Sequence, residues 1–315
     1  MKFLSKQISS ITHTYDNLSD WGKVLLLLCL FLIIYMVFKK NKTEEGFSVQ
    51  NTEFTFKDNR SKMYDKFYVN IYDQLLYSDV KNEFEIEQIV NNTKPTEQSI
   101  ILDVGSATGH HVAALAEQNF KVIGIDQSPE MIEKAKELYP KLDFMEGDVL
   151  KALTFHNNSF THILCLYFTI YYFDNKRQFF DNCMKWLMGG GYLVIHLVDK
   201  YMFDTIIPPA NPLLLLTPQR YSEKRITNSK VTFDEFKYQS DFQINDENNS
   251  AKFIETFSNK ETDKVFRRQE HELFMEPYQE ILNMAKEAGF IVQSKIDMIN
   301  AGYEYQYLFI LTKPN

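Results

Sequence analysis

The chain has 315 residues, of which 44% are apolar and 24% are charged, and its formal net charge is −8. This length allows one or two domains with a substantial core, and an aromatic content of 15% excludes a chain that is disordered throughout. Because 42 acidic residues outnumber 34 basic ones, a general nucleic-acid-binding surface is not expected. The three cysteines, Cys29, Cys165 and Cys183, are too few and too scattered for a disulfide framework or a zinc site, which favours a reducing compartment.

The most apolar segment lies near the N-terminus, from Val24 to Phe38. Extended back to Trp21 and interrupted only by Lys23, it would span about 27 Å as a helix, enough to cross a bilayer core. A cleaved signal peptide needs small residues after the apolar run, but residues 39–42 are mostly lysine. A buried core helix normally keeps some polar positions, and this segment has almost none. We therefore predict a single-pass membrane anchor, and the positive-inside rule places the C-terminal bulk of the chain on the cytoplasmic side.

Composition divides the chain into five parts. Residues 1–20 form a tail, 21–38 the anchor, and 39–60 a polar linker. Apolar residues with helical spacing in 61–98 predict two short helices, and 99–315 form the main domain, with an antiparallel insertion at about 200–275.

Strands and helices alternate in the first half of the main domain, which predicts a parallel sheet covered on both faces. In chain order we expect strands at 100–104, 121–125, 142–145, 162–167 and 192–198, with helices at 113–118, 130–138 and 176–188, the last ended by three glycines.

The pattern changes after residue 199. A loop is expected at 207–218, which contains four prolines. Residues 231–244 nearly alternate between apolar and polar, and we interpret their one phase slip as a β-bulge. Further strands are expected at 253–257 and 265–274, then a helix at 277–288 and a closing strand pair at 291–299 and 303–312.

The chemistry-bearing motif follows the first of these strands, where an apolar run ends at Asp103 and enters a turn of small residues up to Gly109. A phosphate-binding P-loop is excluded, because His110 and His111 stand where Lys and Ser/Thr are needed. A dinucleotide fingerprint is excluded, because Ala107 and His110 occupy glycine positions. The remaining acid-x-Gly-x-small-x-Gly turn could receive an ammonium group at its acid and a carboxylate at its amides.

Acidic residues also follow the next two strands. Asp126 ends the second strand, where an acid commonly binds a ribose diol. Asp148 follows the third strand, where it could accept a hydrogen bond from an adenine amine. A single aspartate at a strand end is usually a helix cap, but three in order indicate a pocket for a nucleoside with an amino-acid tail and no phosphate.

These residues together resemble the class I S-adenosylmethionine-dependent methyltransferases, with Ala107 in place of the usual middle glycine of the first motif. The resemblance covers roughly residues 61–315. It implies an α/β Rossmann-like seven-stranded sheet of order 3-2-1-4-5-7-6, with strand 7 antiparallel, and S-adenosyl-L-methionine as cofactor. The cofactor-binding residues that it implies are Asp103, Gly105, Ser106, Ala107, Gly109, Asp126, Gln127, Met131, Asp148, Val149 and Tyr64; no metal is expected.

A narrower resemblance concerns the substrate. Residues 72–79 and 270–275 are similar to small-molecule methyltransferases, including those that act on sugar amines, in which such helices and an antiparallel insertion roof the active site. For a general base we nominate His196 and His271, each against the alternative of a satisfied core histidine. Tyr72 is a candidate for contact with the cationic sulfonium.

We therefore predict a membrane-anchored methyltransferase that modifies an N or O atom of a small molecule. Residues 167–170 lack the Asn/Asp-Pro-Pro-aromatic turn of enzymes that methylate exocyclic amines of bases or glutamine, and Cys165 lacks the preceding proline of a cytosine-methylating nucleophile. Two alternatives stay open: a methyltransferase for a protein or other macromolecule, and a non-catalytic scaffold that retains the fold.

Overall fold

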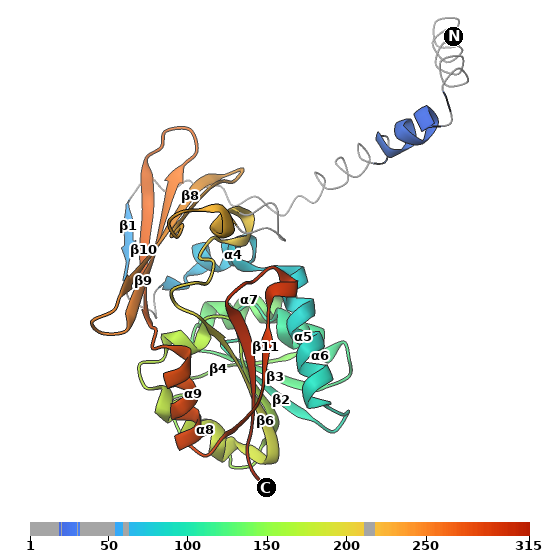
Figure 1. Cartoon of the computed structure of the whole chain (residues 1–315), viewed down its shortest axis with the longest axis vertical. Coiled ribbons are helices and arrows are strands. Elements are labelled where there is room, and N and C mark those ends of the chain that lie inside the picture. The colour runs from blue at the N-terminus through green and yellow to red at the C-terminus, as the bar shows by residue number, and fades with distance from the viewer. Residues whose placement is uncertain (1–18, 20, 30, 32–53, 59–62, 211–217) are drawn as a thin grey trace, which may run out of the picture. The chain divides into compact units, whose positions relative to one another are not determined.

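The computed structural model describes residues 19, 21–29, 31, 54–58, 63–210 and 218–315, and it separates into two compact units, residues 1–48 and 49–315 (Figure 1). In the first unit, residues 21–29 and 31 are helical. The prediction of a transmembrane helix is wrong for the part of the chain that can be judged, since no helix of the described residues is long and apolar enough to cross a membrane. Residues 30 and 32–38 of the expected span lie outside the described residues. The localisation derived from this anchor stays an untested prediction.

The larger unit contains a seven-stranded mixed sheet between two layers of helices (Figure 1). The sheet order is β11-β12-β6-β5-β2-β3-β4, and β12 is antiparallel to both of its neighbours. The strands are β2 (Ile100–Val104), β3 (Lys121–Asp126), β4 (Asp143–Glu146), β5 (Phe160–Cys165), β6 (Leu187–Val198), β11 (Ile291–Asp297) and β12 (Gln306–Thr312).

Five further strands, one before and four within the fold, build a separate sheet. When all strands of the chain are numbered together, the order of the main sheet therefore differs from the predicted one. Counted within the seven-stranded sheet alone, and from its other edge, the observed order corresponds to 3-2-1-4-5-7-6. The core strands β2 and β5 are almost fully buried, as expected for parallel strands covered on both faces.

Helices cover both faces of this sheet. Apolar side chains of α5 (Asp79–Thr93), α6 (His110–Ala116) and α7 (Pro129–Leu138) pack with alternate residues of the strands on one face. Those of α8 (Lys176–Trp186) and α9 (Tyr278–Glu287) pack on the other. The predicted glycine break after α8 is instead the start of β6, in which the amide of Gly190 donates to the carbonyl of Lys313 at 3.0 Å.

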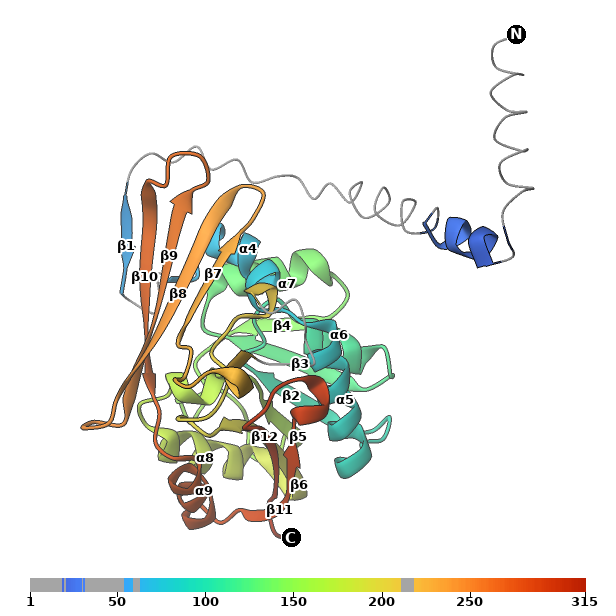
Figure 2. The ribbon, with the colours of Figure 1, turned by 45° about the horizontal axis from the view of Figure 1, so that its top comes forward.

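A second, five-stranded sheet has the order β1-β10-β9-β8-β7 (Figure 2). Its strands are β1 (Thr55–Lys57), β7 (Asn228–Thr232), β8 (Phe236–Asn245), β9 (Ser250–Asn259) and β10 (Val265–Phe274). Strand β1 comes from the predicted linker and pairs in parallel with β10. The phase slip that we interpreted as a bulge is a tight hairpin turn, in which the amide of Phe233 donates to the carbonyl of Phe236 at 2.9 Å.

Helix α4 (Lys66–Leu76) lies against the inner face of the second sheet, because its buried residues Tyr68, Ile71 and Leu75 pack on β8 and β9.

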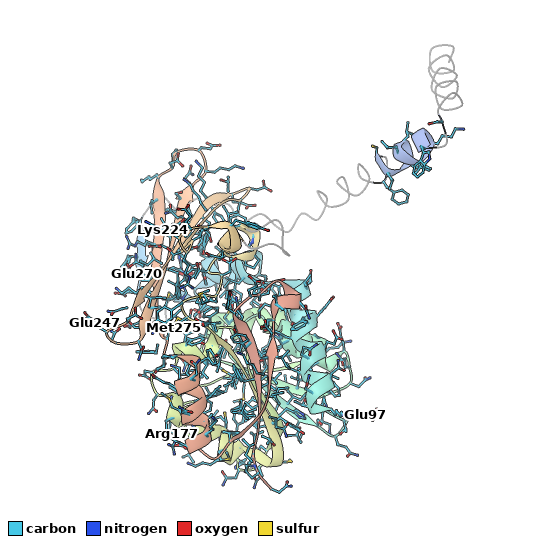
Figure 3. The ribbon with its side chains drawn as sticks, in the orientation of Figure 1. Glu97, Arg177, Lys224, Glu247, Glu270 and Met275 are labelled. Carbon is cyan, nitrogen blue, oxygen red and sulfur yellow. The ribbon has the colours of Figure 1, made fainter. Side chains whose placement is uncertain are left out.

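The short helix η1 (Thr169–Tyr172) follows β5 and contacts β10. In Figure 3, Met275 marks the point where β10 leaves the second sheet for α9, and Glu270 lies on that sheet away from the core. These elements bring the insertion over the carboxyl end of the main sheet.

Candidate active site

A cavity of about 730 Å³ lies at the carboxyl ends of β2, β3, β4 and β5. One end is formed by the turn after β2, by the ends of β3 and β4, and by the start of α7. The other end is formed by α4, η1, the loop after β6 and the inner face of the second sheet. The size is that of a site for one cofactor together with a small ligand.

The turn after β2 depends on three left-handed residues. Gly105 has φ +69°, and a Cβ there would lie 2.5 Å from the Thr169 side chain. Gly109 has φ +90°, and a Cβ there would lie 2.6 Å from Phe144. Between them, Ala107 adopts φ +47°, a conformation that a side chain makes unfavourable. The turn thus keeps the shape that the sequence predicted, although alanine replaces one glycine.

Asp103 is the buried acid of this turn. The residue is only 2% exposed, and its Oδ2 atom has no hydrogen-bond partner among the described residues. Burial raises the pKa of this carboxyl group to about 6; nearby His111 opposes the shift, and the acidic groups of Glu85 and Asp126 add smaller upward contributions. An unpartnered buried carboxylate on a cavity wall is costly for the protein alone and suits a cationic ligand group.

Asp126 fastens the turn to the end of β3. Its Oδ2 accepts from the amide of Ala107 at 3.0 Å, and its Oδ1 accepts from the amide of Ser128 at 2.9 Å. Burial raises the pKa of Asp126, and these backbone hydrogen bonds oppose that shift. Each carboxylate oxygen has a second lone pair, so the group can still accept hydrogen bonds from a diol.

Most of the remaining predicted cofactor residues also line the cavity. Met131 is buried at the start of α7 and contributes an apolar wall. Asp148 accepts from the amide of Leu150 at 2.9 Å through Oδ1. The predicted residues that line the cavity are Tyr64, Asp103, Gly105, Ser106, Ala107, Asp126, Gln127, Met131, Asp148 and Val149.

A buried ion pair on α5 was not anticipated from the sequence. Lys81 Nζ lies 2.6 Å from Glu85 Oε1, and His111 Nε2 lies 2.8 Å from Glu85 Oε2. Although burial alone would raise it, the pKa of Glu85 falls to about 2, because Lys81 and His111 stabilise the anion. Lys81 and Asp103 both line the cavity, whose wall therefore carries a cation as well as a buried carboxyl group.

A polar cluster joins α4 to the turn after β2. Asp73 accepts from Thr108 Oγ1 at 2.6 Å and lies 2.9 Å from His110 Nε2. The ring of His110 stacks on Tyr77 with centroids 3.9 Å apart, and its Nδ1 is 2.8 Å from the Tyr139 hydroxyl. The roof helix is therefore held on the cofactor end of the cavity by specific contacts.

The other end of the cavity is mainly aromatic. The rings of Tyr64, Tyr68 and Tyr72 pack together with centroids 5.7–6.4 Å apart; Tyr72 meets the other two edge to face, and the Tyr64–Tyr68 pair is tilted. His271 Nδ1 is 2.7 Å from the Tyr172 hydroxyl, and His271 Nε2 is 2.8 Å from Glu255 Oε2. Tyr64, Tyr68, Tyr72, Tyr172 and His271 all line the cavity.

Two predicted residues do not line it. Gly109 shapes the turn behind the cavity wall. His196 is fully buried in β6, where Nδ1 donates to the Tyr167 carbonyl at 2.6 Å. Burial lowers the pKa of His196 to about 4, so the ring is neutral at pH 7. We therefore do not retain His196 as a base, and Tyr72 and His271 stay candidates because both face the cavity.

Sequence reasoning missed Glu255, although a signal for it exists. Glu255 shares one strand face with Phe253 and Phe257, where a charged residue is unexpected. Cys165 and Cys183 are buried and free, and burial raises the pKa of both thiols, which fits packing rather than nucleophilic roles. Within the described residues, no group of three His, Cys, Asp or Glu side chains could hold a metal ion.

Comparisons with known proteins agree with this geometry. Residues 101–191 match the family model of a methyltransferase domain. A demethylmenaquinone methyltransferase of Chlorobaculum tepidum is 36% identical over 109 residues, 34% of this chain and 41% of the relative. A dTDP-4-amino-2,3,4,6-tetradeoxy-D-glucose N,N-dimethyltransferase of Saccharopolyspora spinosa is 32% identical over 124 residues, 38% of this chain and 49% of the relative. The chain thus spans less than half the length of either relative.

Solved structures extend the likeness to the roof. The sugar N-methyltransferase KedS8 from Streptoalloteichus aligns with a TM-score of 0.59 at 19% identity, over 86% of this chain and 100% of that one. The amino pentose methyltransferase CalS10 from Micromonospora echinaspora, solved with S-adenosylmethionine bound, aligns with a TM-score of 0.56 at 18% identity, over 81% and 100%. Residues 101–191 are therefore similar to a methyltransferase domain, and the chain has the fold of solved S-adenosylmethionine-dependent methyltransferases.

Proposed function

We propose that this protein is an S-adenosylmethionine-dependent methyltransferase that modifies an N or O atom of a small-molecule acceptor. The observation that carries the proposal is a single cavity of about 730 Å³, which joins the motif turn at Asp103 to an aromatic chamber beneath α4 and the second sheet. A cofactor and an acceptor can meet inside this volume with little water.

The residues at the end of the cavity formed by the turn after β2 fit the proposed cofactor. The unpartnered Oδ2 of Asp103 suits the ammonium group of the methionine moiety, and Lys81 suits its carboxylate. Asp126 suits the ribose diol, and Met131 and Asp148 flank the place for adenine. The unpartnered, buried hydroxyl of Ser106 is a further polar group on this wall. When bound, the cofactor supplies an electrophilic methyl group and a neutral thioether leaving group.

The protein then has two tasks. The first is to hold the acceptor in line with the methyl group, which the roof performs by enclosing the chamber. The second is to stabilise the positive charge beside the reacting carbon, which the faces of Tyr64, Tyr68 and Tyr72 can do, since aromatic rings attract cations. These tasks need no metal ion.

A small acceptor is favoured over a macromolecule because the aromatic chamber is covered by the roof. Helix α4 is fixed to the cofactor turn through Asp73 and to the second sheet through an ion pair between Asp65 and Arg267 at 2.8 Å. The related proteins named for quinone and amino-sugar methylation support the same class of acceptor. A scaffold role would not require an unpartnered, buried Asp103 on the cavity wall.

Calorimetric titration of S-adenosylmethionine into the full chain tests the proposal. We expect micromolar binding that weakens at least 100-fold in Asp126→Ala, because two charge-assisted hydrogen bonds of about 1.5–3 kcal/mol each are lost. Asp143→Ala, at an exposed position at the start of β4, is the matched control and should bind as the wild type does. Absence of binding to the folded wild type, or equal binding by Asp126→Ala, would contradict the proposal.

A further inference from the structure

A continuous chain of polar side chains runs from the aromatic chamber into the second sheet. Tyr64 is hydrogen-bonded to Tyr172. The hydroxyl of Tyr172 is 2.7 Å from His271 Nδ1, and His271 Nε2 is 2.8 Å from Glu255 Oε2. Tyr172 comes from η1, His271 from β10 and Glu255 from β9, so three separate elements converge on one line.

The direction of these hydrogen bonds follows from the ionisation state of the Glu255 carboxyl group. This residue is completely buried, which would raise its pKa, yet hydrogen bonds from His271, Tyr238 and Tyr68 lower the pKa of the carboxyl group overall. An ionised carboxylate only accepts hydrogen bonds, so His271 donates through Nε2. In the neutral imidazole Nδ1 is then an acceptor, and Tyr172 donates to it. With a neutral imidazole, the bond from Tyr172 to His271 and the bond from His271 to Glu255 therefore both point from the cavity toward Glu255.

The surroundings of His271 suit an additional positive charge. The anion of Glu255 has neutral donors in Tyr238 (2.7 Å) and Gln269. The two arginines of this strand are engaged elsewhere, Arg267 by Asp65 at the edge of the roof and Arg268 by Glu270. The groups that face the imidazole are Tyr64 and Tyr68 from the roof, Tyr172 from η1, Glu255 and Phe253 from β9, and Gln269 from β10.

Four of these groups are aromatic rings whose centroids lie 5.7–6.1 Å from that of His271. An aromatic face turned toward a cation stabilises it, and the carboxylate of Glu255 offers direct ion pairing. A proton that reached His271 would thus be held by an anion and an aromatic cage, in the manner of a base oriented by a buried acid.

We propose that Tyr172 and His271 remove the proton of the methyl acceptor, with Glu255 as the positioning residue, and that the acceptor is a hydroxyl compound carried on an apolar ring. This inference rests on the proposed methyltransferase function. As the acceptor oxygen bonds to the methyl carbon, the carbon–sulfur bond breaks and its electron pair stays on sulfur. The acceptor proton passes to the Tyr172 oxygen while the Tyr172 proton passes to His271 Nδ1, and the imidazolium later releases it to solvent.

A hydroxyl acceptor explains the chain better than a neutral amine does. An amine in its neutral form attacks through its free lone pair and can lose its proton to water afterwards. A hydroxyl group is a weak nucleophile until its proton leaves, so it gains most from a positioned base. The aromatic walls of the chamber match the apolar ring of such an acceptor.

The first test is long-range ¹H–¹⁵N NMR of the full chain labelled with ¹⁵N-histidine, which needs no acceptor. We expect His271 to carry its proton on Nε2 and to show a hydrogen-bonded Nδ1, and Tyr172→Phe to shift the Nδ1 resonance to its unbonded position. Tyr238→Phe is the matched control, because it removes a donor to Glu255 outside the chain and should leave Nδ1 unchanged. A proton on Nδ1, or an Nδ1 resonance that ignores Tyr172→Phe, overturns the inference.

The second test uses methyl transfer from labelled S-adenosylmethionine to a panel of paired phenols and anilines. We expect transfer to a phenol that falls about 10²–10⁴-fold in His271→Gln and Tyr172→Phe, with the affinity for S-adenosylmethionine unchanged. Transfer to anilines alone, undiminished in His271→Gln, overturns the inference while leaving the methyltransferase function intact. A wild type that does not bind S-adenosylmethionine overturns the proposed function itself.

Discussion

Replacing Asp103 with asparagine should stabilise the unliganded protein while it weakens cofactor binding. Burial raises the pKa of Asp103 in the folded protein to about 6, against an ordinary value of 3.8. A carboxyl group with a raised folded-state pKa contributes stability that is fully present below pH 3.8 and lost as the pH rises through 6. At pH 7–8 the full shift of about 2 pKa units applies, which corresponds to about 3 kcal/mol of lost stability.

The pH dependence distinguishes this explanation from a simple packing effect. Asparagine has no charge to desolvate, so its buried amide affects stability equally at every pH. At pH 5 the folded wild type is largely protonated at Asp103, and only about half of the electrostatic loss is present. The stability gained by Asp103→Asn should therefore be about 1.5 kcal/mol larger at pH 8 than at pH 5, or roughly 3–6 °C in melting temperature for a domain of this size.

The assay is thermal unfolding of wild type and Asp103→Asn at both pH values, with and without S-adenosylmethionine. The exposed Asp143→Asn serves as the control for loss of one negative charge. Added S-adenosylmethionine should raise the melting temperature of the wild type much more than that of Asp103→Asn. A gain that does not change between pH 5 and pH 8, or a wild type that is favoured at pH 8, would refute the reasoning.

Three further predictions follow from the same site. Binding of S-adenosylmethionine should release protons near pH 6 and tighten between pH 5 and pH 7, because its ammonium group favours ionised Asp103. Calorimetry in two buffers of different ionisation enthalpy measures the number of protons released, and an affinity independent of pH would contradict the prediction. Ala107→Gly should raise the free energy of unfolding by roughly 0.5–1 kcal/mol, because glycine adopts φ +47° without strain; an unchanged or lower value in denaturant melts would argue against strain at this residue. Lys81→Met should lower stability by about 3–5 kcal/mol, because buried Glu85 then keeps only His111 as an ion-pair partner, and the double variant with Glu85→Gln should recover most of that loss; a double variant as unstable as Lys81→Met would show that the ion pair is not the cause.

The main sheet could be predicted because its strands carry strong local signals. Residues 100–104 form an uninterrupted buried strand, and the turn after them ends in glycines whose left-handed conformation the spacing implies. The proximity of Asp103 and Asp126 could be predicted from the sequence, because parallel strands place their carboxyl ends at one edge of the sheet.

The second sheet was less predictable because its pairing is set by distant residues. Strand β1 has only three residues and exists through its pairing with β10, more than 200 positions away. The turn at residues 233–236 joins two strands of similar alternation, so a hairpin and a bulge give nearly the same pattern until the partner strands are known.

The chain of Tyr172, His271 and Glu255 could not be assembled from sequence. Its members are separated by up to 99 residues, and each alone has an ordinary structural explanation. The apolar segment near the N-terminus gave a wrong prediction from a strong local signal. Hydropathy alone predicted a membrane helix there, and the described residues do not form one.

The most direct test of the central claim is a crystal structure of the full chain with S-adenosylhomocysteine. We expect the adenosine between Met131 and Asp126, with the ammonium group within hydrogen-bonding distance of Asp103 Oδ2. A ligand bound elsewhere, or a cavity that stays empty at saturating concentration, would contradict it.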